Sequence, residues 1–198
     1  SRGGFNKNRV VRDFALDGGK YYKVSVYARQ SDKASAYVSL VSTVNAQREI
    51  ATLVREEVGN IGYQKITAEL FVETSGVYQL GIEGEVPSSS WNLMIDDFTV
   101  EALSVGTPVN LSVEAVTKSS VELSWLGNGD SYEVEITQGN VVVSTIQVSD
   151  TKATITGLQA SSSYKARVRA TKDGVISGWA EVLFNTMCGV VYPPFIED

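Results

Sequence analysis

Apolar side chains recur at every second position over most of this chain, and this alternation sets the class of fold. The segment KYYKVSVYAR places on one face Tyr22, Val24, Val26 and Ala28. A period of two is that of a half-buried strand, because successive side chains of a strand point to opposite faces of the sheet. The same alternation continues in ASAYVSLVS, YQKITAELFVE and GVYQLGIEGE. The pattern predicts an all-β protein.

One segment, NAQREIATLVREEVGN, has apolar residues at helical spacing, at Ile50, Leu53 and Val54. A helix there is the alternative, but we expect a strand that leads into a loop, because the neighbouring segments are all β. With NRVVRDFALD before these strands and WNLMIDDFTVE after them, the first hundred residues predict six or seven strands.

The chain has 198 residues, which suits two domains of ordinary size. Glycine and proline in SVGTPVN break the pattern, so we place the domains at 1–104 and 105–187, followed by a linker at 188–198. The sequence of the second domain predicts seven short strands, as in a β-sandwich. They are Val109–Val116, Ser119–Trp125, Ser131–Thr137, Val141–Val148, Lys152–Thr156, Ser163–Thr171 and Val175–Thr186.

Residues 107–187 resemble a fibronectin type III domain, which has an immunoglobulin-like β-sandwich fold. The resemblance lies in SSVELSW, SYEVEI and ITGLQASSSYKARVRA, in which a tyrosine follows the leucine of GL by six residues. It implies a tyrosine corner, with the Tyr164 hydroxyl bonded to backbone near the turn. The alternation predicts an inward face of Val121, Leu123, Trp125, Tyr132, Val134, Ile136, Tyr164, Ala166 and Val168. Trp179 is expected to pack within this fold.

Residues 8–102 resemble a jelly-roll domain of the galactose-binding, cleaved-adhesin or carbohydrate-binding-module type found on bacterial surfaces. The resemblance rests on the closing strand, in which aromatic and apolar residues surround Ile-Asp-Asp. It implies a secreted or cell-surface bacterial protein. Such domains usually have one or two more strands before the one expected at Arg9. The tail CGVVYPPFIED is similar to a linker that opens another such domain.

Composition excludes several function classes. Histidine is absent, Cys188 is the only cysteine, and the net charge is −6. The chain therefore lacks an imidazole base, an internal disulfide and a zinc cluster of Cys and His ligands. The negative charge opposes nucleic-acid binding. No apolar run is long enough to insert into a membrane.

Asp96 and Asp97 interrupt the last strand of the first domain. Leu93 and Ile95 share one phase, whereas Phe98 and Val100 share the other, so a β-bulge is expected between them. The structural interpretation is that one carboxylate turns inward and accepts hydrogen bonds. The functional alternative is calcium as a structural cofactor, because carboxylates suit a hard cation.

Three aromatic residues are candidates for ligand binding. Trp91 follows the loop VPSSS and can stack on a sugar ring or cover the core. Tyr27 and Tyr37, together with Tyr21, lie on the polar phases of their strands, where they form an aromatic binding face or simple cross-strand pairs.

No catalytic pair stands out. Glycosidases use two acids, and the sequence should then place one in an apolar setting and the other in a polar setting. It does not do so for the candidates Glu83, Glu85, Asp96 and Asp97, so we expect no enzyme. The resemblance favours adhesion or carbohydrate binding by the first domain, with a glycan or a host or cell-surface protein as partner and the second domain as spacer. The alternatives are a purely structural spacer or an accessory region of a secreted hydrolase.

Overall fold

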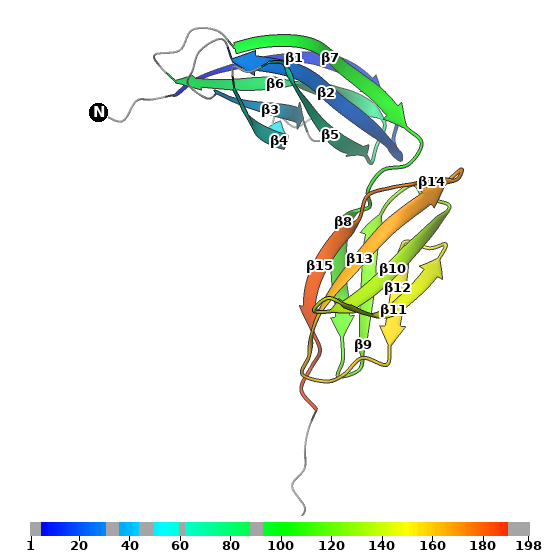
Figure 1. The fold of residues 1–198 in the computed structure, drawn as a ribbon. Coiled ribbons are helices and arrows are strands. Elements are labelled where there is room, and N and C mark those ends of the chain that lie inside the picture. The colour runs from blue at the N-terminus through cyan, green and yellow to red at the C-terminus, as the bar shows by residue number, and fades with distance from the viewer. Residues whose placement is uncertain (1–4, 31–35, 44–49, 60–61, 88–92, 190–198) are drawn as a thin grey trace, which may run out of the picture. The chain divides into compact units, whose positions relative to one another are not determined.

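The computed structural model describes residues 5–30, 36–43, 50–59, 62–87 and 93–189. The chain divides into two compact units, Ser1–Ser104 (unit 1) and Val105–Asp198 (unit 2), and each is described by itself. Every regular element in these described ranges is a β-strand (Figure 1), and none is a helix able to cross a membrane. The prediction of an all-β fold is confirmed.

The described residues of unit 1 form seven strands in two antiparallel sheets. The four-stranded sheet has the order β1-β6-β3-β4, and the three-stranded sheet has the order β5-β2-β7 (Figure 1). The strands are β1 Phe5–Leu16, β2 Lys20–Gln30, β3 Ala36–Thr43, β4 Ile50–Val58, β5 Gln64–Val72, β6 Gly76–Pro87 and β7 Leu93–Leu103. The described part of the segment with helical spacing, from Ile50 onward, is thus a strand, β4, as its β surroundings predict.

The core of unit 1 lies between its two sheets. Alternate residues of β2 are at most 8% exposed, and β5 and β6 contribute Ile66, Val72 and Leu80 in the same way. The alternation therefore identified this core correctly. β4 contacts β5 across the sandwich, so the two sheets meet along that side.

The strand pairing of unit 1 follows one rule. β1 pairs with β6, β2 with β5 and β3 with β4, as in one long hairpin that has been folded over. Two further pairs, β2 with β7 and β3 with β6, join the arms of this hairpin into two sheets. The rule matters because it places each strand beside partners that are distant in the sequence.

β7 carries the expected bulge. Ser25 of β2 is paired with Thr99, and Tyr27 is paired with Asp96, so Asp97 and Phe98 together face the single residue Val26. Asp97 has a φ of 49°, in the left-handed region. The extra residue brings Phe98 and Val100 to the core side, which explains the change of apolar phase across the two aspartates.

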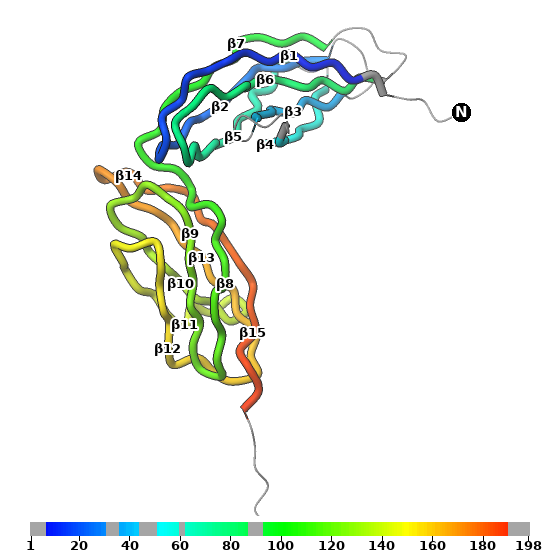
Figure 2. Tube along the Cα trace, turned by 180° about the vertical axis from the view of Figure 1, so that it is seen from behind, coloured from blue at the N-terminus to red at the C-terminus, as the bar shows by residue number. Residues whose placement is uncertain are grey.

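Within unit 2, the residues up to 189 form eight strands. One sheet has the order β12-β9-β8, and the other has the order β11-β10-β13, with β14 and β15 also paired to β13 (Figure 2). The strands are β8 Val109–Val116, β9 Ser120–Leu126, β10 Ser131–Gln138, β11 Val141–Val148, β12 Lys152–Thr156, β13 Ser163–Lys172, β14 Val175–Ile176 and β15 Ala180–Asn185.

The single last strand expected over Val175–Thr186 is wrong, because it is divided into β14 and β15. Ser177 interrupts it: its N–H donates to the carbonyl of Ala170, and its hydroxyl accepts the Ala170 N–H, both at 2.9 Å. The nine residues predicted to face inward are all buried, at no more than 4% exposure. The predicted core of unit 2 is therefore confirmed.

Candidate functional site: the outer face of the β5-β2-β7 sheet

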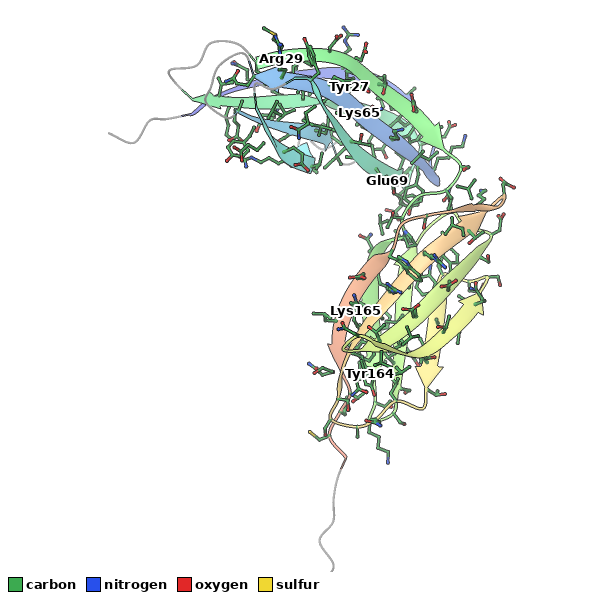
Figure 3. All side chains as sticks on the ribbon, viewed as in Figure 1. Tyr27, Arg29, Lys65, Glu69, Tyr164 and Lys165 are labelled. Carbon is green, nitrogen blue, oxygen red and sulfur yellow. The ribbon has the colours of Figure 1, made fainter. Side chains whose placement is uncertain are left out.

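Tyr27 lies at the centre of one polar row on the outer face of the three-stranded sheet. Its partner on β5 is Lys65, and its partner on β7 is Asp96. Arg29 lies two residues further along β2 and therefore shares this face. Figure 3 shows Tyr27, Arg29 and Lys65 on this sheet. We call Tyr27, Arg29, Lys65 and Asp96, together with the adjacent Tyr63, the Tyr27 face.

The Tyr27 face combines aromatic rings with cations. Lys65 Nζ is 5.4 Å from the centre of the Tyr27 ring, and Arg29 Cζ is 5.5 Å from the centre of the Tyr63 ring. Arg29 also donates to the sulfur of Met94 at 3.2 Å. Within the described part of the chain, neither Lys65 nor Arg29 has a carboxylate at ion-pair distance. Each cation can therefore donate hydrogen bonds to a ligand.

Both aspartates of the bulge are exposed, so the expected inward carboxylate is wrong. Asp96 Oδ1 accepts a hydrogen bond from the backbone N–H of Asp97 at 2.9 Å, which holds the bulge. Calcium takes six to eight oxygen ligands. Among the described residues, no group of three or more acidic side chains is placed to hold a metal ion. The described residues thus give Asp96 and Asp97 no third carboxylate, and the hydrogen bond of Asp96 gives this residue a structural role in the bulge.

Tyr37 does not join the Tyr27 face. It belongs to β3 in the four-stranded sheet, whereas Tyr27 belongs to β2 in the other sheet. Arg55 covers the Tyr37 ring, with Cζ 3.7 Å from its centre. Tyr21 is fully buried against Phe71, at 4.7 Å between ring centres. A single aromatic face built from these three tyrosines, as the alternation suggested, is thus wrong. Trp91, the third predicted ligand-binding residue, lies outside the described residues.

Glu83 and Glu85 are engaged in ion pairs on the outer face of the four-stranded sheet. Glu85 lies between Arg55 at 3.2 Å and Lys7 at 3.1 Å, and Glu83 accepts hydrogen bonds from Arg9. Hydrogen bonds from Arg55 and Lys7 lower the pKa of Glu85, and the bond from Arg9 lowers the pKa of Glu83. A general acid needs a raised pKa, so neither glutamate suits that role.

Unit 2 shows its predicted tyrosine corner. The backbone N–H of Gln159 donates to the Tyr164 hydroxyl at 2.9 Å. Trp179 packs on the surface, with Arg167 and Arg169 at 4.4 Å and 4.5 Å from its ring centre. These arginines form ion pairs with Glu135 and Glu133 of β10. The charges on this face are thus paired with one another.

Sequence reasoning missed three members of the Tyr27 face: Arg29, Lys65 and Tyr63. The only available signal was the alternation, which puts Arg29 in the phase of Tyr27. Lys65 lies 35 to 45 residues further along the chain than the residues of β2, and no local pattern states which residue it faces. The register of β2 and β5 decides that contact.

Comparison with known proteins identifies unit 2. The family model of the fibronectin type III domain matches residues 106–186. Similar solved structures include the fn3 domain of human collagen alpha-1(XX) chain, at 22% identity and a TM-score of 0.39, covering 43% of this chain and 88% of that one. Domains d3-d4 of the rat CD45 extracellular region have 18% identity and a TM-score of 0.40, covering 48% and 56%. The FN5 domain of Drosophila Lar has 17% identity and a TM-score of 0.36, covering 43% and 99%. No curated protein matches the chain.

Proposed function

From the premise that residues 106–186 are a fibronectin type III domain, we propose that the chain is a non-catalytic part of a secreted or cell-surface bacterial protein. Unit 1 binds a carbohydrate on the Tyr27 face, and unit 2 serves as a spacer. Fibronectin type III domains are typically structural, non-catalytic modules, which supports the second role. A jelly-roll type for unit 1 is part of this proposal, and the folded-hairpin pairing of its two antiparallel sheets supports it.

The observation that carries the proposal is the row Lys65, Tyr27 and Asp96 across three paired strands. A sugar ring offers an apolar face, which an aromatic ring covers, and hydroxyl groups, which donate to a carboxylate and accept from a cation. Tyr27 supplies the ring, and its two neighbours supply an acceptor and a donor. Because these residues lie on strands of one sheet, their spacing is fixed before any ligand binds.

A purely structural spacer remains the second candidate, and one observation favours it. Lys65 lies near the Tyr27 ring and Arg55 lies over the Tyr37 ring, so each ring already has a cation as neighbour. Such contacts stabilise a sheet surface without any ligand. The two candidates differ in whether the Tyr27 ring becomes covered by a further molecule.

A glycan array separates the two candidates. We expect the chain to bind at least one class of glycan, and Tyr27→Ala to weaken this binding by about fivefold or more, because an aromatic contact contributes about 1 kcal/mol beyond its area. Tyr37→Ala is the matched control, since Tyr37 is a half-buried tyrosine on the other sheet. Trp91→Ala tests the remaining aromatic candidate. If no glycan binds, or if both tyrosine variants bind like the original chain, carbohydrate binding on the Tyr27 face is wrong and the spacer reading replaces it.

A further inference from the structure

One side of the unit 1 sandwich is open. β1 is the outer strand of one sheet and β7 is the outer strand of the other, and Figures 1 and 2 show the two strands along the same side of unit 1. Among the described strands, β7 pairs only with β2. Its second edge therefore offers backbone N–H and C=O groups for pairing with a further strand.

Core positions beside this edge are uncovered. Val10 and Arg12 of β1 are in the inward phase, opposite Ile82 and Leu80, yet Val10 is 67% exposed and Arg12 is exposed. On β7, the inward residue Ile95 is 38% exposed. Equivalent positions on the opposite side of the sandwich, such as Ile66 and Val58, are at most 1% exposed. The apolar side chains of Val10 and Ile95 are thus exposed on the side where β7 lacks a neighbour.

A groove of about 400 Å³ connects the two strands. Its lining is mostly apolar and includes Val10, Phe14, Leu80, Ile82 and Phe98. The rings of Phe14 of β1 and Phe98 of β7 both line it, with their centres 6.2 Å apart. A strand added beside β7 would place alternate side chains in this groove, in the same way that β2 covers the other half of the core.

The pairing rule of unit 1 agrees with this position. In the folded hairpin, β6 pairs with β1 and β5 pairs with β2. Among the described strands, β7 has no such hairpin partner, so the rule leaves a place for one more strand beside it. The segments 1–4 and 190–198 do not suit the position. The first has four residues against the eleven of β7, and the second contains Pro193 and Pro194, which lack the N–H that a ladder needs.

A second copy of the chain does not suit the edge either. Asp96 and Asp97 are exposed at the middle of β7, and neither has a cation at ion-pair distance in the described ranges. Pairing β7 with another β7 would oppose these acids to one another, and the net charge of −6 adds repulsion. A strand with lysine or arginine beside Asp96 is favoured instead.

We propose that the edge of β7 and the groove against β1 form a docking site for an extended strand from polypeptide outside residues 1–198. This strand has apolar residues at alternate positions, which fill the groove. Between them it has basic residues, which form ion pairs with the aspartates of the bulge. The result is a four-stranded sheet that covers Val10 and Ile95. The docking site shares Asp96 with the Tyr27 face, but its groove lies on the inner side of the sheet and peptide binding is measured without a glycan, so its test does not depend on carbohydrate binding.

The test uses the full chain and a capped ten-residue peptide of alternating valine and lysine. Binding is followed by NMR of backbone amides and by hydrogen exchange. We expect saturable shifts in β7 and at Val10, slower exchange of β7 amides, and a higher unfolding temperature for unit 1. Val10→Lys should weaken binding at least tenfold. Val77→Lys is the matched control, because Val77 is 62% exposed on the adjacent strand and does not line the groove.

A second peptide with five valines followed by five lysines has the same charge and composition but no alternation. The proposal is overturned if the alternating peptide does not bind, if the block peptide binds equally well, or if both valine variants weaken binding to the same extent. It is also overturned if the chain alone forms a dimer through β7 in sedimentation and amide-shift measurements, because the occupant is then a second copy.

Discussion

The backbone N–H of Asp17 donates a hydrogen bond to the hydroxyl of Tyr22 at 2.9 Å. The same arrangement, with the same spacing of five residues and the same distance, joins Gln159 to Tyr164 in unit 2. In both cases a buried leucine, Leu16 or Leu158, comes directly before the donor. Two sandwiches of different strand order therefore use one device to fix the chain where it enters a strand, and unit 1 has a tyrosine corner that its sequence did not reveal.

Replacing either corner tyrosine by phenylalanine should destabilise only its own unit. Tyr22→Phe and Tyr164→Phe each leave a part-buried N–H without its acceptor, which costs about 1–3 kcal/mol. Amide hydrogen exchange measures the free energy of unfolding of each unit separately. Tyr27→Phe is the control, because the Tyr27 hydroxyl has no hydrogen-bond partner in the described part of the chain. Equal effects of all three changes would show that the corner bonds are not stabilising.

The left-handed backbone at Asp97 predicts an unusual order of substitutions. Asp97→Gly should keep or slightly raise the stability of unit 1, whereas Asp97→Val should lower it by about 2 kcal/mol, because a β-branched residue is strained at a φ of 49°. Chemical denaturation gives both values. At Asp13, in the regular strand β1, the order should be reversed, with valine more stable than glycine. The same order at both positions would contradict the bulge geometry.

The ion pairs of Glu85 predict a loss of stability in acid. Because Arg55 and Lys7 lower the pKa of Glu85, its carboxylate stabilises the fold above its unfolded pKa of about 4.3, and this contribution is lost as the pH falls through the lower folded pKa. Glu85→Gln should therefore cost about 1–2 kcal/mol at pH 7, and this cost should shrink as the pH falls through the lowered pKa of Glu85. Unfolding free energies from pH 7 to pH 2 test this.

Glu101→Gln is the control for that series. The Glu101 side chain is 60% exposed and lies 3.8 Å from Lys23, whereas the Glu85 side chain is 11% exposed. Exposed pairs contribute little, so this variant should follow the original chain at every pH. A pH-independent cost of Glu85→Gln would mean that packing, and not charge, explains its effect.

Calcium should leave the unfolding temperature of unit 1 unchanged. A site with a Kd of about 10 μM would contribute about 2.7 kcal/mol at about 1 mM calcium, which calorimetry in calcium and in chelator would detect. The exposed aspartates of the bulge are too few to form such a site from the described residues. A rise that disappears in the Asp96→Asn, Asp97→Asn double variant would instead establish calcium binding there.

Much of the fold was predictable because its signals are local. The alternation marked the inward residues of β2, β9 and β10, and the change of phase across Asp96 and Asp97 marked the bulge. The division of the last strand was not predictable, since it depends on Ser177 bonding to Ala170 of β13. The chain reverses direction between Ala170 and Ser177, and a local pattern cannot show that these two residues then bond to each other.

The candidate site was predictable only in part. Tyr27 and Asp96 were both identified from the sequence, but their pairing was not, and Tyr37 was grouped with Tyr27 although the two lie in different sheets. The charge pattern gave no sign that Lys65 would face Tyr27. Nor did it show that Glu83 and Glu85 would be paired with cations of β1 and β4.

The sequence by itself determined that the chain forms strands, where most of them begin and end, and which side chains of each strand point inward. Only the tertiary structure decided which strands are neighbours, in what register, and which edge is left without a partner. The physical reason is that a period of two is unchanged when a strand shifts by two residues or exchanges its neighbour. Partner and register are instead selected by the packing of the whole core and by the bulge at Asp97.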